Sequence, residues 1–97
     1  MALDVRFTDL ARGTLNELDA SVRERIVDKL GETVDFPEHF LDPLTSVPGY
    51  KLRVGDFRLV VDWDRGDDVL YVVAILRRKH DYRELPGIGE VWGTWRE

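Results

Sequence analysis

The amino-acid sequence predicts an α+β fold, in which an N-terminal strand and a helical hairpin precede an antiparallel three-stranded meander. Three observations support this fold: helical periodicity between residues 8 and 34, strict alternation over residues 50–63, and an apolar run over residues 69–76. We expect a three- or four-stranded antiparallel sheet with both helices packed on one of its faces. The length of 97 residues is enough for one hydrophobic core. We expect one domain, over residues 1–85. A tail over residues 86–97 follows it and is expected to pack on it.

The first part of the chain predicts a short strand and two helices. Apolar and polar residues alternate over residues 3–7, which is typical of a strand. Thr8 or Asp9 can cap a first helix, and Asp19 or Ser21 can start a second. Apolar residues recur at helical spacing in both helices: Leu10, Ala11, Leu15 and Leu18 in the first, and Val22, Ile26, Leu30 and Val34 in the second.

Residues 35–49 contain three prolines, at positions 37, 43 and 48. Because proline lacks the amide donor and restricts the preceding residue, we expect no regular structure in this segment. Its apolar side chains still require burial, so we expect the loop to lie against the core through Phe36, Phe40, Leu41, Leu44 and Val47.

Residues 50–63 predict two strands joined by a two-residue turn at Gly55-Asp56. In this register position 54 faces 57, 53 faces 58, 52 faces 59, 51 faces 60 and 50 faces 61. One face of the hairpin is then wholly apolar: Tyr50, Leu52, Val54, Phe57, Leu59, Val61 and Trp63.

The other face of this hairpin carries Lys51, Arg53 and Arg58, with the two arginines directly opposite each other. Like charges at paired positions repel and cost stability. Two explanations are open at this point. Aspartates such as Asp62 or Asp64 neutralise a solvated face, or the cations bind an anionic partner.

Residues 69–76 predict an inner strand that is covered on both faces, because the run is apolar on both sides. The strand ends in the basic run Arg77-Arg78-Lys79-His80-Asp81-Tyr82-Arg83. If it pairs beside the second hairpin strand, the two basic clusters come together. Arginine and lysine hold phosphates, and Tyr82 can stack on an exposed base, so RNA fits this surface.

The tail supplies the unassigned apolar residues of the sequence: Ile88, Val91, Trp92 and Trp95. A sheet face that is apolar and uncovered is unusual on a free monomer. We therefore expect the tail to fold back over the sheet face opposite the helices. The alternative is a tail that only oligomer or crystal contacts order, because it contains two glycines and termini are usually mobile.

Composition excludes several other classes of protein. The chain has no cysteine, so it has neither a disulfide framework nor thiolate chemistry. Its two histidines, His39 and His80, are far apart in sequence, and we expect no metal site. No apolar run approaches the length of a membrane span, and no signal peptide is visible, so we expect a cytoplasmic protein. The net charge is −5, but basic side chains outnumber acidic ones in residues 50–83.

The segment YKLRVGDFRLVV at residues 50–61, followed by an apolar strand and RRKHDYR at residues 77–83, resembles the RelE/ParE toxin superfamily. The likeness is to RelE-like messenger-RNA interferases of toxin–antitoxin systems and covers residues 2–85. It implies a type II toxin that is a ribosome-dependent mRNA endoribonuclease and uses the 2′-hydroxyl of its substrate as nucleophile. Because this nucleophile belongs to the RNA, no metal or other cofactor is expected.

The resemblance also implies roles for individual residues. Lys51 and Arg53 resemble the basic pair of the family, Arg58 its phosphate-stabilising arginine, Arg78 its general acid and Tyr82 its stacking tyrosine. The basic run itself, rather than the resemblance, predicts that Arg77, Lys79 and Arg83 bind RNA. The family often has a lysine base where this chain has Arg53, and an arginine, with a pKa above about 12, is a poor base. Lys51 or His80 could serve instead.

The same resemblance implies a cognate antitoxin, with which the toxin can form an oligomer. An antitoxin carrying apolar anchors and acidic residues would compete with the tail or pack against the helical hairpin, and would neutralise Arg53, Arg58 and Arg78. Two other functions remain open. One is a ParE-like toxin that inhibits gyrase. The other is a catalytically inactive binding protein with the toxin fold, which Arg53 and the acidic net charge favour.

Overall fold

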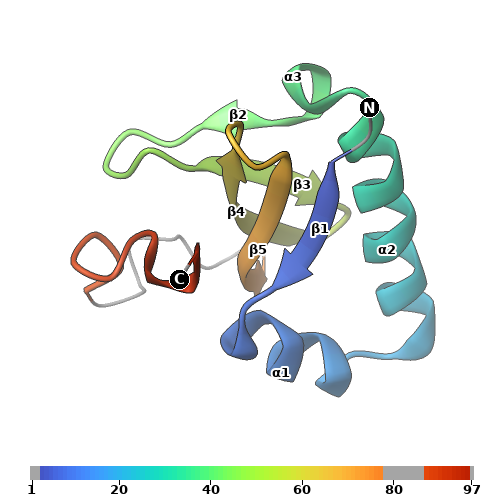
Figure 1. Cartoon of the computed structure of the whole chain (residues 1–97). Coiled ribbons are helices and arrows are strands. Elements are labelled where there is room, and N and C mark those ends of the chain that lie inside the picture. The colour runs from blue at the N-terminus through green and yellow to red at the C-terminus, as the bar shows by residue number, and fades with distance from the viewer. Residues whose placement is uncertain (1–2, 78–86, 97) are drawn as a thin grey trace.

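The computed structural model describes residues 3–77 and 87–96, and their elements form a single five-stranded sheet with helices on one face (Figure 1). Strand order is β1-β5-β4-β3-β2, with β1 parallel to β5 and the other neighbours antiparallel. The elements in chain order are β1 (Asp4–Phe7), α1 (Asp9–Glu17), α2 (Ala20–Asp35), α3 (Pro37–Phe40), β2 (Asp42–Pro43), β3 (Tyr50–Val54), β4 (Phe57–Asp64), β5 (Val69–Arg77) and the 3₁₀-helix η2 (Thr94–Arg96).

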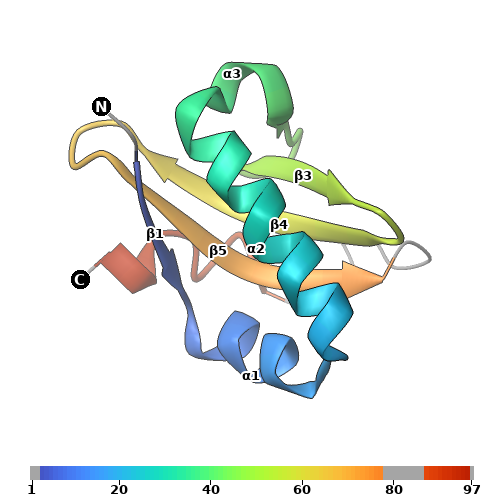
Figure 2. The same cartoon turned by 90° about the vertical axis from the view of Figure 1, so that its right-hand side faces the viewer.

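The predicted α+β class is confirmed, but the expected purely antiparallel sheet of three or four strands is wrong. Two short edge strands extend the β3–β4–β5 meander to five. Strand β1 pairs in parallel with β5, because α1 and α2 carry the chain back across the sheet before the meander begins. Figure 2 shows α2 crossing in front of the strands, so this side of the sheet is called the helix face and the other side the open face.

The two helices begin close to where the sequence predicts. The Thr8 hydroxyl accepts a hydrogen bond from the Ala11 amide at 3.2 Å and donates one to the Val73 carbonyl at 2.7 Å, so it caps α1 and anchors it to β5. Ile26 and Leu30 are buried in α2. Leu10, expected on the apolar side of α1, is 58% exposed, since Ala11 faces the sheet instead. Within the described part of the chain, no helix is long and apolar enough to cross a membrane.

Residues 35–49 are more regular than the prolines suggest, because they include α3 and β2. Pro37 lies at the start of α3. A backbone N–H at this position has no intrahelical hydrogen-bond partner, so the helix tolerates its absence in proline. Pro43 lies in an edge strand, where proline is tolerated. Leu41 and Val47 are buried as expected, whereas Phe36 is 65% exposed and does not join the core.

The sheet separates two apolar layers. The register of β3 and β4 is the predicted one, from Tyr50 opposite Val61 to Val54 opposite Phe57. The larger layer lies between the helices and the sheet and includes Leu52, Leu59 and Val61. On the open face, a second buried cluster consists of Val60, Val73 and Ala74, packed against Leu44, Leu76, Ile88, Trp92 and Trp95.

Residues 87–96 lie on the open face, on the side of the sheet opposite α2 (Figure 1). The rings of Trp92 and Trp95 meet edge to face, with centroids 5.0 Å apart. Trp95 Nε1 donates a 2.9 Å hydrogen bond to the buried carboxylate of Asp62. Arg96 forms an ion pair with the same carboxylate. Val91, expected to pack with the tryptophans, is 48% exposed.

Replacement of Gly49 by alanine tests how closely this tail packs. A Cβ at Gly49 would overlap the Trp92 ring and lie 2.9 Å from the Val61 carbonyl oxygen. We expect Gly49→Ala to lower the free energy of unfolding by about 1–3 kcal/mol, as overpacking does. Urea unfolding followed by circular dichroism measures this change.

Gly13→Ala in α1 is the matched control, because a Cβ there has no atom within 4 Å beyond its own helix. This change should stabilise the protein by about 0.5–1 kcal/mol, since glycine weakens a helix interior. If Gly49→Ala unfolds at the same urea concentration as the wild type, Trp92 does not lie on Gly49.

Candidate functional site

The basic residues of the β3–β4 hairpin gather on one end of the open face. Arg53 lies directly opposite Arg58, and Lys51 lies opposite Val60. Arg53 is exposed, whereas Lys51 and Arg58 are half-exposed. In the neighbouring pair of strands, Arg58 is opposite Leu76. The open face is therefore divided between a basic end near the hairpin turn and an apolar end beneath the tail.

The arginines of this face keep their charges unpaired within the described residues, where neither Arg53 nor Arg58 forms an ion pair. Asp62 and Asp64, which the sequence offers as possible neutralising groups, instead bind Arg96, at 3.8 Å in the case of Asp64. Neutralisation by those two aspartates therefore does not explain why Arg53 and Arg58 lie opposite each other. Among the described residues, Arg53 and Arg58 have no neutralising carboxylate.

The Arg96 guanidinium holds the tail to β4. Partial burial lowers the pKa of Arg96, but the hydrogen bond and charge of Asp62, together with the charge of Asp64, raise it above the usual value. An arginine side chain is protonated at every pH at which proteins are normally folded, even without such a rise in its pKa. Arg96 is therefore a permanent cation, and this ion pair leaves Asp62 unavailable to the basic end of the face.

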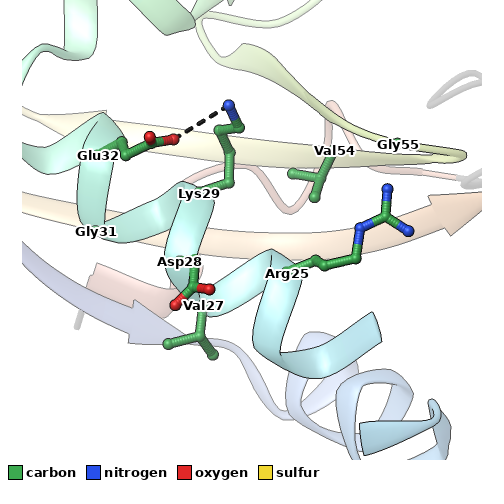
Figure 3. A pocket seen from close by; sticks show the side chains of 8 residues that line it. All are labelled: Arg25, Val27, Asp28, Lys29, Gly31, Glu32, Val54 and Gly55. Carbon is green, nitrogen blue, oxygen red and sulfur yellow. Dashed lines mark ion pairs between the residues drawn. The ribbon is translucent and has the colours of Figure 1, made fainter. Parts of the chain in front are cut away.

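Two further arginines approach the hairpin turn from the helix face. Arg77, at the end of β5, lies opposite Phe57, and its guanidinium is 5.7 Å from the centroid of that ring. Arg25 of α2 lies against Gly55 (Figure 3). In the helical pattern of the sequence, Arg25 falls outside the apolar stripe of α2. No signal in the sequence could reveal its position, since it depends on the angle at which α2 crosses the sheet.

An open groove of about 620 Å³ separates α2 from this turn. Its lining combines cations, carboxylates and a few apolar atoms: Arg25, Val27, Asp28, Lys29, Gly31, Glu32, Val54 and Gly55 (Figure 3). Lys29 and Glu32 form an ion pair at 3.1 Å. In residues 3–77 and 87–96, no group of three or more histidine, aspartate or glutamate side chains is placed to hold a metal ion.

The remaining predicted site residues cannot be placed on this surface. Arg78, Lys79, His80, Tyr82 and Arg83 lie outside the described residues. The geometry of the site therefore concerns the hairpin, the end of β5 and the adjoining turn of α2.

The sequence and the fold are similar to those of known toxins. The family described as ParE toxin of type II toxin-antitoxin system, parDE, matches residues 5–82. A mutant of the Escherichia coli toxin RelE in the free state is 25% identical, with a TM-score of 0.75 over 94% of this chain and 99% of that one. No curated protein matches the chain.

Toxin–antitoxin complexes are also among the similar structures. The RelBE2 complex from Mycobacterium tuberculosis has a chain that is 23% identical, with a TM-score of 0.74 over 80% of this chain and 100% of that one. The mutant E. coli RelE bound to a peptide of the antitoxin RelBc is 28% identical, with a TM-score of 0.68 over 88% of this chain and 90% of that one.

Proposed function

We propose that this chain, which belongs to the ParE toxin family of type II toxin–antitoxin systems within the RelE/ParE superfamily, is a ribosome-dependent mRNA endoribonuclease. One observation carries the proposal: Arg53 lies opposite Arg58 on the open face, without a carboxylate partner among the described residues. Two like charges at paired positions cost folding stability. A phosphate bound between the two arginines would offset this cost, and phosphate binding would be the function of the pair.

The proposed reaction needs a nucleophile, a base, an acid and a group that stabilises charge. The substrate 2′-oxygen attacks the adjacent phosphorus and loses its proton to a base, while the bond from phosphorus to the 5′-oxygen breaks. An acid, for which we propose Arg78, protonates the leaving 5′-oxygen. Arg58 would bind the non-bridging oxygens, whose negative charge increases in the transition state. Tyr82 would stack on a neighbouring base.

The base of this reaction can be identified with two substitutions. Lys51→Arg keeps the positive charge, but arginine cannot accept a proton at working pH. If Lys51 is the base, this change should reduce cleavage by about 10²–10⁴-fold, the usual contribution of acid–base catalysis. If His80 is the base, His80→Gln should do so instead. Single-turnover cleavage of mRNA on translating ribosomes measures both effects. Full activity in both variants would exclude both residues and favour proton transfer to solvent.

An antitoxin is the protein partner of this toxin, as in the toxin–antitoxin complexes that share its fold. We propose that residues 1–85 form the toxin domain and that residues 86–97 form a tail packed on it. An antitoxin with acidic residues would silence the toxin by neutralising Arg53, Arg58 and Arg78 or by covering them.

A second candidate function is inhibition of DNA gyrase, because the matching family is the ParE family. Two assays separate the candidates: mRNA cleavage on translating ribosomes and supercoiling by DNA gyrase, each with and without the purified toxin. Cleavage without loss of supercoiling supports the nuclease. Loss of supercoiling without cleavage supports the gyrase inhibitor. No effect in either assay supports a catalytically inactive protein with the toxin fold.

A further inference from the structure

The guanidinium of Arg25 lies against the turn that joins β3 to β4. A Cβ built on Gly55 would be 2.5 Å from Arg25 Nη2 and 3.3 Å from its Cζ, so the two residues pack closely. Gly55 has a φ of 55°, which glycine adopts without strain. Figure 3 shows the Arg25 side chain extending from α2 toward this turn. Glycine at this position therefore permits the turn and leaves room for the guanidinium.

Four arginines surround the turn from both sides of the sheet: Arg25, Arg53, Arg58 and Arg77, here named the tip arginines. The first and last lie on the helix face, and the other two on the open face. None of the four forms an ion pair with another described residue. Such a concentration of positive charge on a chain with a net charge of −5 indicates a partner with several negative charges.

The carboxylates near Arg25 indicate the path that such a partner takes. Asp28 and Glu32 line the groove between α2 and the turn, so an acidic protein segment that ran along the groove would meet them. A phosphate backbone that crosses the turn would meet Arg25, which lies against Gly55, and Arg53 on the other face of the sheet. Asp56 is exposed in the turn, but the tip arginines outnumber it. These charges favour a nucleic acid over an acidic peptide.

We propose that Arg25 is a phosphate-binding residue, and that the RNA-binding surface continues from the open face around the hairpin turn to α2. This inference rests on the proposed function and adds a contact with the sugar–phosphate backbone away from the scissile bond. Arg25 and Arg58 lie on opposite faces of the sheet. Arg25 therefore contributes to RNA affinity and not to the bond-breaking step.

The salt dependence of RNA binding tests this inference. The probe is a fluorescent, single-stranded oligoribonucleotide with 2′-O-methyl groups, which lacks the attacking hydroxyl and is not cleaved. Each lost phosphate contact reduces the slope of log K against log salt by about 0.7 for single strands. Arg25→Gln should reduce the slope by this amount and weaken binding about fivefold at 0.1 M salt. Arg25→Lys should keep the slope of the wild type.

Three comparison variants separate the possible outcomes. Arg12→Gln removes the same charge from an exposed position on α1 and should leave the slope unchanged. If Arg53→Gln and Arg58→Gln reduce the slope while Arg25→Gln behaves like Arg12→Gln, the inference about Arg25 is wrong and the proposed RNA surface stands. If neither open-face variant reduces it, the RNA surface itself is wrong. A loss of antitoxin binding by Arg25→Gln with an unchanged RNA slope would also overturn the inference.

Cleavage kinetics give a second readout that a structural role would not produce. Arg25→Gln should raise KM on translating ribosomes while kcat stays near that of the wild type, because the contact is made equally in the ground state and the transition state. A fall in kcat with unchanged KM would contradict a role in affinity. Circular dichroism verifies that the variant is folded.

Discussion

Arg58→Ala is expected to reduce mRNA cleavage by about 10²–10³-fold, the usual cost of losing one group that stabilises transition-state charge. The guanidinium can donate two hydrogen bonds to the non-bridging oxygens of the scissile phosphate, and alanine can donate none. Because Arg58 would act chiefly in the transition state, the loss should fall on kcat and not only on KM. Steady-state cleavage of mRNA on translating ribosomes gives both constants.

The stability of Arg58 variants distinguishes this role from a structural one. Arg58→Gln keeps most of the aliphatic stem and removes the repulsion between Arg58 and Arg53, its paired neighbour. The variant should therefore be equally stable, or more stable by about 0.2–1 kcal/mol, while losing cleavage. Arg12→Ala on α1 is the matched control and should change neither quantity. Wild-type cleavage by both Arg58→Ala and Arg78→Ala would refute the proposed roles of these residues.

The β3–β4 hairpin could be predicted pair by pair because its signals are local. Alternation along each strand selects the face of every side chain, and the two-residue turn at Gly55 fixes the register. The pairing of Arg53 with Arg58 follows directly from these two facts. The burial of β5 on both faces also follows from its composition alone.

Contacts between distant segments could not be predicted, since they depend on how whole elements pack. The neighbour of Gly55 is Arg25, which is thirty residues earlier in the chain, and only the path of α2 across the sheet brings them together. From the sequence, Asp62 was a possible neutralising group for the hairpin arginines, but Trp95 and Arg96 bind its carboxylate. The tail was expected to cover the open face through apolar residues, and its polar contacts with β4 had no signal in the sequence.

Truncation after residue 86 is expected to lower the free energy of unfolding by about 3–5 kcal/mol. The truncated protein loses Trp92 and Trp95 from the open-face cluster, which exposes Val60 and its neighbours to water. It also loses the donors to the Asp62 carboxylate, which is 1% exposed in the full chain. Urea unfolding followed by circular dichroism measures the loss without depending on the number of tryptophans.

A double-mutant cycle separates the polar part of this loss from the apolar part. Asp62→Asn removes the buried charge, so truncation should cost about 1–3 kcal/mol less in this background than in the wild type. The Arg96 side chain is 38% exposed, and solvent screening keeps the coupling below that of a fully buried pair. An equal cost in both backgrounds would show that Asp62 does not hold the tail.

Single substitutions in the full chain test the same contact if the truncated protein does not fold. Trp95→Phe removes the indole N–H that donates to Asp62, and should destabilise the protein by about 1–3 kcal/mol because it leaves a buried carboxylate with one donor fewer. Trp63→Phe is the matched control, since the buried Nε1 of Trp63 has no hydrogen-bond partner among the described residues. Both changes replace an indole by a phenyl ring, and only Trp95→Phe also removes a hydrogen bond. If Trp63→Phe costs as much as Trp95→Phe, or if truncation leaves the unfolding midpoint unchanged, the hydrogen bond to Asp62 does not stabilise the fold.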